Sequence, residues 1–153
     1  QEAWKMLLDA PREPDKLIDL EGWWSERRLN CRIALNSGQP RIAYEIAAQH
    51  GPISGDAYIE AEFLAGWIAL RFLSEPETAL GHFLALRAAA KGSKNLALAE
   101  YWLGRTSLAL GDNGQALVHF HAAAKYPQYF YGQLGRQALD ARPATTGAPS
   151  AVN

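Results

Sequence analysis

Cysteine, an excess of charge of one sign, long hydrophobic runs and strand patterns are scarce or missing in this chain, and these absences limit the classes of protein to which it can belong. Among 153 residues there is one cysteine, Cys31, which cannot form an internal disulfide, so cysteine usage does not identify the compartment. Neither sign of charge dominates, because the chain has 15 basic and 16 acidic side chains and a formal net charge of −1. This balance excludes the electrostatic footprint of a general nucleic-acid or anionic-membrane binder.

Long hydrophobic runs and strand patterns are also missing. The longest apolar run extends from Phe63 to Leu70, whereas a membrane-spanning helix needs about 20 such residues, so no membrane span is expected. No stretch alternates with period two for long enough to predict a strand. The eight prolines fall outside the interiors of the expected helices, apart from first turns. The sequence therefore predicts an all-α protein, and its 48% hydrophobic content indicates a globular one.

The stretch from Leu98 to Tyr131 is typical of a helical hairpin. Apolar or small residues at helical spacing predict two helices, with Gly111 ending the first and Asp112 capping the second in capping-box spacing with Gln115. The order of small, aromatic and proline positions in this unit is close to that of a tetratricopeptide repeat.

The same unit occurs earlier in the chain. Glu62 to Gly66 aligns with Glu100 to Gly104 at an offset of 38, and Ala79 to Phe83 aligns with Ala116 to Phe120 at an offset of 37. A weaker third copy precedes them, with its first helix at Arg32 to Leu35. Three hairpins at one period predict tetratricopeptide-like units stacked into an α-solenoid, or superhelix.

The remaining segments complete the predicted organisation. Residues 1–14 are interpreted as the remnant of a preceding helix broken by Pro11 and Pro14, and 15–141 as the α-superhelical repeat domain. Residues 142–153 are interpreted as an Ala/Pro-rich linker or disordered tail. Because the chain opens on Gln1, we expect a mature or excised piece of something longer. Helices are expected over 2–10, 17–36, 41–50, 56–73, 77–90 and 128–141, with a second capping box at Ser74 and Glu77.

Two glycines sit where helices should be continuous. Gly66 and Gly104 occupy the same repeat position inside predicted helices, where glycine costs about 1 kcal/mol relative to alanine. We expect the compensation to be close approach of a neighbouring helix.

The ionisable residues provide weak candidates for chemistry. Glu62 and Glu100 are the acids most expected near apolar surroundings, as a glycosidase acid would require. Their shared repeat position favours instead a structural pairing, with one of five arginines: Arg27, Arg28, Arg32, Arg71 and Arg105. His82 and His119 are repeat-equivalent, which favours a packing or surface role, and His119 and His121 cannot chelate together on one helix. We therefore predict no catalytic residue, no cofactor and no metal site within the chain.

Serines and aromatic residues add little to this prediction. None of the serines has a Gly-x-Ser-x-Gly context. The aromatic residues are numerous enough to line a groove for sugar or peptide, although their helical spacing favours the core: Trp23, Trp24, Trp67, Trp102, Tyr126, Tyr129, Phe130 and Tyr131.

Several segments, in order, resemble one family. The residues are Trp23 to Arg28, Arg32 to Leu35, Ala43-Tyr44, Ala65 to Arg71, Ala79 with His82-Phe83, Tyr101-Trp102-Leu103-Gly104-Arg105, Ala122 to Ala124 and Phe130-Tyr131-Gly132-Gln133-Leu134. This succession resembles the superhelical region of the soluble lytic murein transglycosylases, over about Trp23 to Leu139. The resemblance implies a periplasmic parent enzyme that cleaves peptidoglycan glycan strands to leave 1,6-anhydro ends, with its chemistry in a separate lysozyme-like domain.

That catalytic domain should carry a Glu-Ser pair and a Gly-Leu-Met-Gln motif. Neither occurs in this chain, and its only methionine is Met6. The leading hypothesis is therefore a non-catalytic helical scaffold, whose partners are peptidoglycan and the missing catalytic domain of the same chain. A free-standing tetratricopeptide-like adaptor that binds a protein partner through its concave face is the alternative. An enzyme complete within these residues is a third.

Overall fold

A computed structural model describes residues 2–10 and 19–141 of the chain. The predicted tail at 142–153, the breaks at Pro11 and Pro14 and the predicted helix start at Leu17 lie outside these residues. In the described part every regular element is an α-helix, which confirms the all-α prediction. The helices are α1 (Glu2–Asp9), α2 (Leu20–Asn36), α3 (Pro40–Ala48), α4 (Gly55–Arg71), α5 (Pro76–Ala89), α6 (Ser93–Ala109), α7 (Asn113–Ala124) and α8 (Phe130–Asp140).

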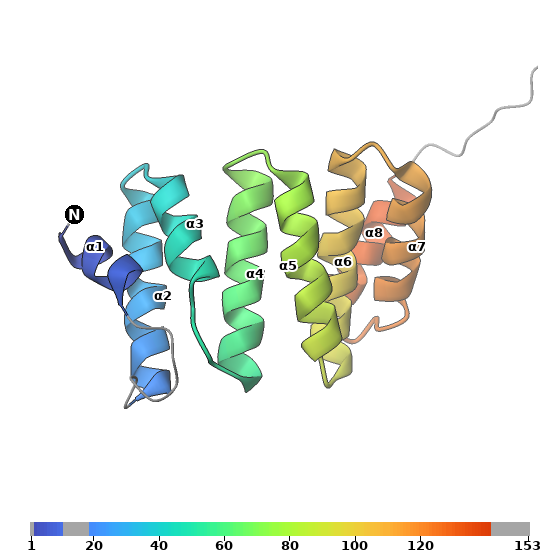
Figure 1. Cartoon of the computed structure of the whole chain (residues 1–153). Helices are drawn as coiled ribbons and strands as arrows, with labels where there is room; N and C mark the ends of the chain where they lie inside the picture. The colour runs from blue at the N-terminus through green and yellow to red at the C-terminus, as the bar shows by residue number, and fades with distance from the viewer. Residues whose placement is uncertain (1, 11–18, 142–153) are drawn as a thin grey trace, which may run out of the picture.

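The helices lie side by side in the order of the chain (Figure 1). Each of α2, α4 and α6 packs against the helix that follows it, forming the hairpins α2–α3, α4–α5 and α6–α7. Consecutive hairpins meet through α3 with α4 and through α5 with α6, while α8 packs on both α7 and α6. The first helix of one hairpin therefore contacts the last helix of the hairpin before it.

Glycine and proline set the limits of these helices. Gly38 follows α2 with φ +74° and Gly111 follows α6 with φ +79°, a left-handed conformation that glycine adopts without steric cost. Pro40 and Pro76 are the first residues of α3 and α5, where a missing N–H costs nothing. Asp112 caps α7 by accepting a hydrogen bond from the Gln115 N–H at 3.0 Å, which confirms the predicted cap. The second half of the predicted capping box is wrong, because the Asp112 N–H donates to the Ser107 carbonyl oxygen at 2.9 Å.

The predicted capping box at Ser74 is wrong. Because Pro76 is the first helical residue, the N-cap of α5 is Glu75, and no side-chain hydrogen bond caps that helix end. Ser74 lies in the turn with φ +54°, and the Glu75 carboxylate pairs with Arg41 instead.

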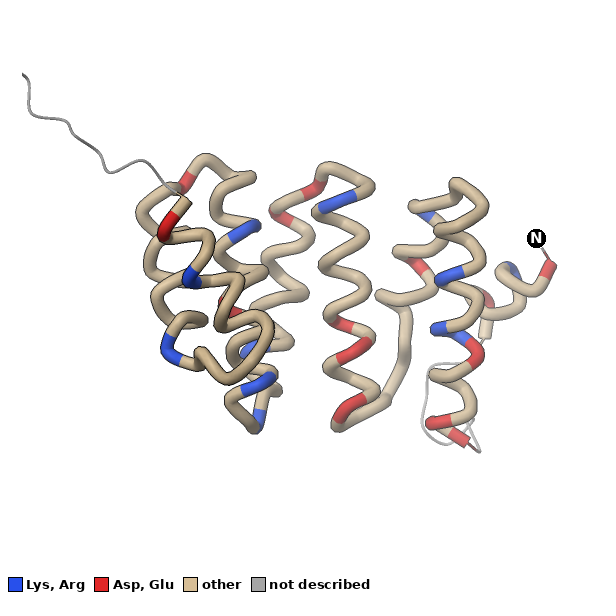
Figure 2. Tube along the Cα trace, turned by 180° about the vertical axis from the view of Figure 1, so that it is seen from behind, with Lys and Arg blue, Asp and Glu red and all other residues tan. Residues whose placement is uncertain are grey.

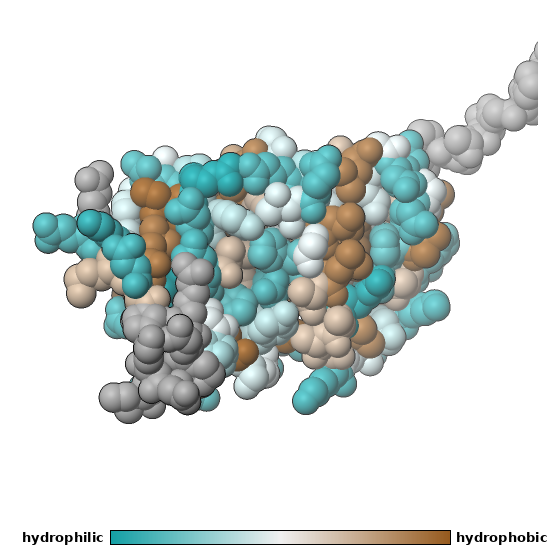
Figure 3. Space-filling view, viewed as in Figure 1, coloured by the Kyte–Doolittle hydropathy of each residue, from teal (hydrophilic) through white to brown (hydrophobic). Residues whose placement is uncertain are grey.

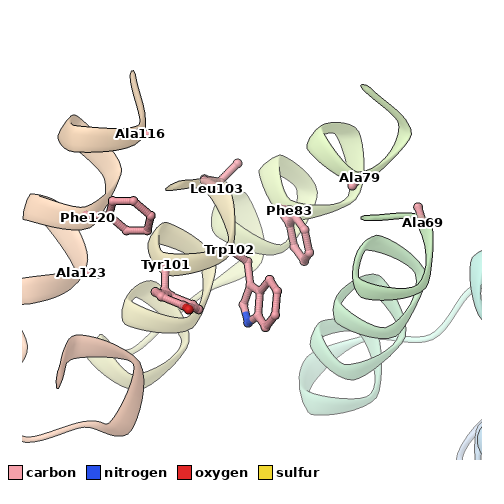
Figure 4. Close-up of a cluster of buried hydrophobic side chains, with 9 residues drawn as sticks. All are labelled: Ala69, Ala79, Phe83, Tyr101, Trp102, Leu103, Ala116, Phe120 and Ala123. Carbon is pink, nitrogen blue, oxygen red and sulfur yellow. The ribbon is translucent and has the colours of Figure 1, made fainter. Parts of the chain in front are cut away.

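The core is built from large aromatic rings set against small residues. One cluster unites residues of α4, α5, α6 and α7 (Figure 4): Ala69, Ala79, Phe83, Tyr101, Trp102, Leu103, Ala116, Phe120 and Ala123. In it, the Trp102 ring stacks on Phe83 at 6.0 Å between centroids, and Tyr101 lies 5.9 Å from Phe120.

The two mid-helix glycines make this packing possible. A Cβ placed on Gly66 would lie 2.8 Å from Phe83 Cε1, and one placed on Gly104 would lie 2.5 Å from Phe120 Cε1. Any side chain at either position would overlap the ring of the second helix in the same hairpin. The expectation of close approach at Gly66 and Gly104 is therefore confirmed.

Candidate functional site

Three buried or partly buried charged residues occupy one structural position in the three hairpins. Arg27, Glu62 and Glu100 are each the eighth residue of their helix, in α2, α4 and α6. Each bonds to the second helix of its own hairpin and to the segment that precedes the hairpin. We call this arrangement the clamp position.

Glu62 forms the most complete clamp. Its Oε2 lies 2.7 Å from Nδ1 of His82 on α5, and its Oε1 lies 2.9 Å from Nε2 of His50, which follows α3. The second ring nitrogens are also engaged, His82 Nε2 with the Tyr44 hydroxyl at 2.9 Å and His50 Nδ1 with the Gly51 carbonyl at 2.7 Å. One carboxylate thus joins α4 to α5 and to the end of the preceding hairpin.

The hydrogen bonds of Glu62 favour its ionised form. Burial opposes its ionisation, but the hydrogen bonds from His50 and His82, together with their charge, outweigh burial and lower the pKa of Glu62 to about 2. A glycosidase general acid needs the opposite, a pKa raised towards neutrality. Glu62 is therefore unsuited to donate a proton in catalysis.

Glu100 repeats the arrangement one hairpin later. Its Oε2 lies 2.7 Å from Nδ1 of His119 on α7, and its Oε1 accepts a hydrogen bond from Arg87 of α5 at 3.4 Å. His82 and His119 are the seventh residues of α5 and α7, so the helix positions that pair are the same in both hairpins.

Arg27 fills the clamp position of the first hairpin with the opposite charge. Its Nε donates to the carbonyl of Ile46, the seventh residue of α3, at 3.0 Å, and its Nη1 donates to the Leu7 carbonyl of α1 at 2.6 Å. The side chain is only 1% exposed, so these carbonyls replace the water lost on burial. In the α2–α3 hairpin, the Arg27 guanidinium and two backbone carbonyls join the hairpin to the preceding segment. In the other two hairpins, a carboxylate and two basic side chains make this connection.

The predicted partners of the two acids are wrong, although the predicted structural role stands. In the described part of the chain, Glu62 and Glu100 pair with none of the five proposed arginines: Arg28 binds Glu60 on the surface, and Arg105 donates to the Tyr101 hydroxyl at 2.8 Å. The sequence held one signal for the true partners, since histidine recurs at the seventh position of α5 and α7. His50 and Arg87 lie outside the aligned pairs of residues and gave no such signal.

Other candidates for chemistry are also occupied or inert. Tyr44, His82 and Glu62 form a chain of hydrogen bonds like that of a base-activated nucleophile. However, burial, and then the charges of Glu75 and Glu62, raise the pKa of Tyr44, so its hydroxyl is held in the neutral form. Burial likewise raises the pKa of the Cys31 thiol to about 11. Within the described residues no three His, Cys, Asp or Glu side chains are grouped to hold a metal ion.

Two of the motifs that carry the family resemblance pack against each other. Tyr131 of α8 lies 5.6 Å from Tyr101 and 6.4 Å from Trp102 between ring centroids. The Arg105 guanidinium lies over both α6 rings, at 5.8 and 5.9 Å. The Tyr-Trp-Leu-Gly-Arg and Phe-Tyr-Gly-Gln-Leu motifs therefore meet at the contact between α6 and α8.

Shallow hollows lie between the first helices of the hairpins. The hollow between α2 and α4 has a volume of about 340 Å³ and is lined by two arginines, Arg28 and Arg32, by the acidic Glu60 that pairs with Arg28, and by apolar side chains that include Leu64 and Trp67. Of the predicted aromatic residues, Trp24 and Trp102 are buried, whereas Phe130 is 65% exposed. Seen from behind, acidic and basic residues are interspersed along the helices (Figure 2), with no broad region of one sign among the residues described.

Comparison of the chain with protein-family models, with curated proteins and with solved structures gives no match. In the part of the chain that the structure describes, no helix has the length and apolar character needed to cross a bilayer, as the sequence predicts.

Proposed function

We propose that this chain is a non-catalytic scaffold of tetratricopeptide-like hairpins stacked into an α-solenoid, and that it belongs to a lytic murein transglycosylase of the periplasm. The observation that carries the scaffold is the clamp position. In all three hairpins, the eighth residue of the first helix joins its own hairpin to the preceding segment. Such nearest-neighbour bonding is what a linear stack of repeats requires.

The clamps also argue against a reaction centred on these acids. The acid best placed to act as a glycosidase acid, Glu62, has both oxygens engaged and a pKa lowered to about 2. The chemistry of the parent protein would then lie in a separate domain, which the scaffold positions. Assignment to the transglycosylases rests on the sequence resemblance, supported by the packing of its two motifs against each other.

The first experiment incubates the purified chain with murein sacculi and analyses the soluble products by mass spectrometry. We expect no 1,6-anhydro-muropeptides from this chain, whereas a protein extended to the end of the parent reading frame should release them. Release by the 153-residue chain alone would overturn the scaffold assignment. An extended protein without activity, or a reading frame without a Glu-Ser-bearing domain, would overturn the family assignment.

The alternative, an adaptor that binds a protein partner, is favoured by one observation. The hollow between α2 and α4 is lined by the exposed Arg32 and by Trp67, a basic and an aromatic side chain suited to an acidic or C-terminal peptide segment. Peptides selected from a random library should lose binding on Arg32→Glu and keep it on Arg136→Glu, which lies on α8 away from the hollow. Selection of no peptide, or equal loss with both variants, would refute the adaptor.

A further inference from the structure

A hollow of about 830 Å³ lies between α1 and α2, at the end of the row of helices where the chain begins (Figure 1). Apolar side chains of both helices line it, together with one just after α1: Ala3, Met6, Leu7, Ala10 and Trp23. Met6 is 74% exposed, so this large apolar side chain remains in contact with water. Burying it under a partner is favourable, and a methionine adapts its shape to the surface that covers it.

The contact that holds α1 is of the same kind as the contact between consecutive hairpins. Arg27 of α2 donates to the Leu7 carbonyl, in the last turn of α1. In the same way, Glu100 of α6 accepts a hydrogen bond from Arg87, in the last turn of α5. Relative to α2, α1 therefore occupies the place that the second helix of a hairpin occupies relative to the first helix of the next hairpin.

One difference separates α1 from the other helices in that place. The second helices α3, α5 and α7 each pack on the helix before them and on the helix after them. Among the described residues, the substantial contacts of α1 are with α2 and α3, which both follow it in the chain. The groove between two packed helices accepts the side-chain ridge of a third helix. The position of α1 in the stack therefore indicates a helix as the occupant of the hollow.

The charged side chains that line the hollow are mostly acidic. They are three acids and one lysine: Glu2, Lys5 and Asp9 of α1 and Glu26 of α2. Within the described part of the chain, none of the three carboxylates forms an ion pair. A partner that covers Met6 comes close to these carboxylates, so basic residues beside its apolar surface are attracted and acidic residues are repelled.

We propose that the hollow between α1 and α2 binds an amphipathic α-helix whose apolar stripe covers Met6 and Trp23 and whose flanking residues are basic. The apolar stripe packs on α1 as the first helix of a hairpin packs on the second. The basic residues lie beside Glu2, Asp9 and Glu26. This inference goes beyond the scaffold role, because it assigns a partner to the open end of the stack.

The test measures the binding of fluorescent peptides of about 18 residues, or five turns of helix, to the full 153-residue chain. One peptide has leucine and alanine at helical spacing and lysine at its other positions. A second replaces every lysine by glutamate, and a third is the lysine peptide with two central prolines, which prevent the helix. We expect the lysine peptide to bind at least about tenfold more tightly than either of the others. No binding of the lysine peptide, or equal binding of any two of the three, would overturn the proposal.

Two variants of the chain locate the binding. Met6→Gln keeps the length of the side chain but removes its apolar end, and it should weaken binding of the lysine peptide about tenfold. Glu26→Lys should weaken binding of the lysine peptide and strengthen binding of the glutamate peptide, each several-fold. The matched controls are Val118→Gln on α7 and Glu77→Lys on α5, at exposed positions outside the hollow, and they should change neither affinity. A control that loses as much binding as its counterpart would contradict the proposed site.

A second measurement needs no variant, because Met6 is the only methionine of the chain. A carbon-13 label on the methionine methyl group therefore gives a single NMR signal from the hollow. The lysine peptide should shift this signal, and the glutamate peptide at the same concentration should not. Dilution of the chain without peptide should leave the signal unchanged. A shift on dilution would show that a second copy of the chain covers the hollow, and this result would overturn the proposal.

Discussion

At the scale of single residues, the ionised Glu62 gives the clearest pH dependence in acid. Its folded-state pKa is lowered from 4.5 to about 2, so the unfolded chain binds the proton more readily than the folded one. The stabilisation from this carboxylate is present above pH 4.5 and is lost as the pH falls towards 2. A shift of this size corresponds to about 3 kcal/mol, and with the side chain only 10% exposed, solvent screens little of it.

We therefore expect Glu62→Gln to lower the free energy of unfolding by about 3 kcal/mol at about pH 6, measured by urea denaturation. The difference from the unmodified chain should shrink steadily between pH 4.5 and pH 2. Glu60→Gln is the matched control on the same helix, since Glu60 pairs with Arg28 at the surface and such pairs contribute about 0–1 kcal/mol. A constant difference between Glu62→Gln and the unmodified chain throughout this acid range would contradict the assigned ionisation.

Replacement by alanine at two glycines in successive helices should change the free energy of unfolding in opposite directions. Gly104→Ala drives a Cβ against the Phe120 ring and should destabilise the protein by about 1–3 kcal/mol. At Gly81, inside α5, an added Cβ would have no heavy atom within 4 Å, so Gly81→Ala should stabilise by up to about 1 kcal/mol through helix propensity. Thermal and urea unfolding of the two variants decide the matter, and a stabilising Gly104→Ala would refute the packing role.

Sequence reasoning reached the glycines but not the histidine partners, and the reason is physical. A glycine repeated inside two helices implies close packing whatever the rotation of the neighbouring helix. Which basic side chain meets Glu62 depends on how one hairpin is rotated on the next, and no local pattern reveals that. The same holds for Ser74, where the serine-glutamate spacing suited a cap but Pro76 moved the helix start by one residue.

At the scale of elements, α8 depends on glycines that allow it to approach α7. A Cβ on Gly132 would overlap the carbonyl oxygen of Tyr126, and one on Gly135 would lie 2.8 Å from Ala123 Cβ and 3.0 Å from the Phe120 carbonyl oxygen. The backbone carbonyls of Tyr126 and Phe120 cannot move aside for an added Cβ as the end of a flexible side chain could. These two positions therefore fix how closely α8 lies on α7, at Gly135, and on the turn after it, at Gly132.

Gly132→Ala should release α8 from α6 and α7 while the rest of the chain stays folded. We expect faster amide hydrogen exchange over Phe130–Asp140 and greater exposure of Tyr101 and Trp102, seen as a red shift in tryptophan fluorescence. Gly114→Ala is the control, because a Cβ there lies 3.7 Å from its nearest neighbour, Asp112 Oδ1. Unchanged exchange in α8 would show that α8 tolerates a shift away from Tyr126.

The helices themselves were largely predictable, because apolar periodicity and helix ends are encoded locally. The helices predicted over 41–50, 56–73 and 77–90 correspond to α3, α4 and α5 to within a turn at each end. The prediction placed the last hairpin from Leu98, whereas α6 begins at Ser93, directly after the extended Gly92. The first turn of α6 is largely polar and has no side-chain cap, so the sequence carries no local signal of this helix start.

At the scale of the whole molecule, the helices pack on their neighbours along the chain. The α2–α3 hairpin contacts α4–α5, and the α6–α7 hairpin contacts both α4–α5 and α8. Among the described residues, α2–α3 and α6–α7 make no substantial contact with each other. On the face seen in Figure 3, hydrophobic side chains gather in one stripe over α2 and another between α5 and α6. Exposed Leu29 and Ile33 of α2 and Leu84 of α5 contribute to the apolar surface of the molecule.

This arrangement predicts how the effects of mutations combine. Glu62 and His82 share one clamp, so Glu62→Gln and His82→Gln remove the same hydrogen bond, and the double variant should lose less stability than the sum of the two. Glu62→Gln and Gly104→Ala act on different hairpins, the second through Phe120, and their effects should add within about 0.5 kcal/mol. Urea unfolding of these single variants and of the two corresponding double variants gives both coupling energies. Strong coupling between Glu62 and Gly104 would mean that strain at the Phe120 ring reaches the clamp of the neighbouring α4–α5 hairpin through the contact between α5 and α6.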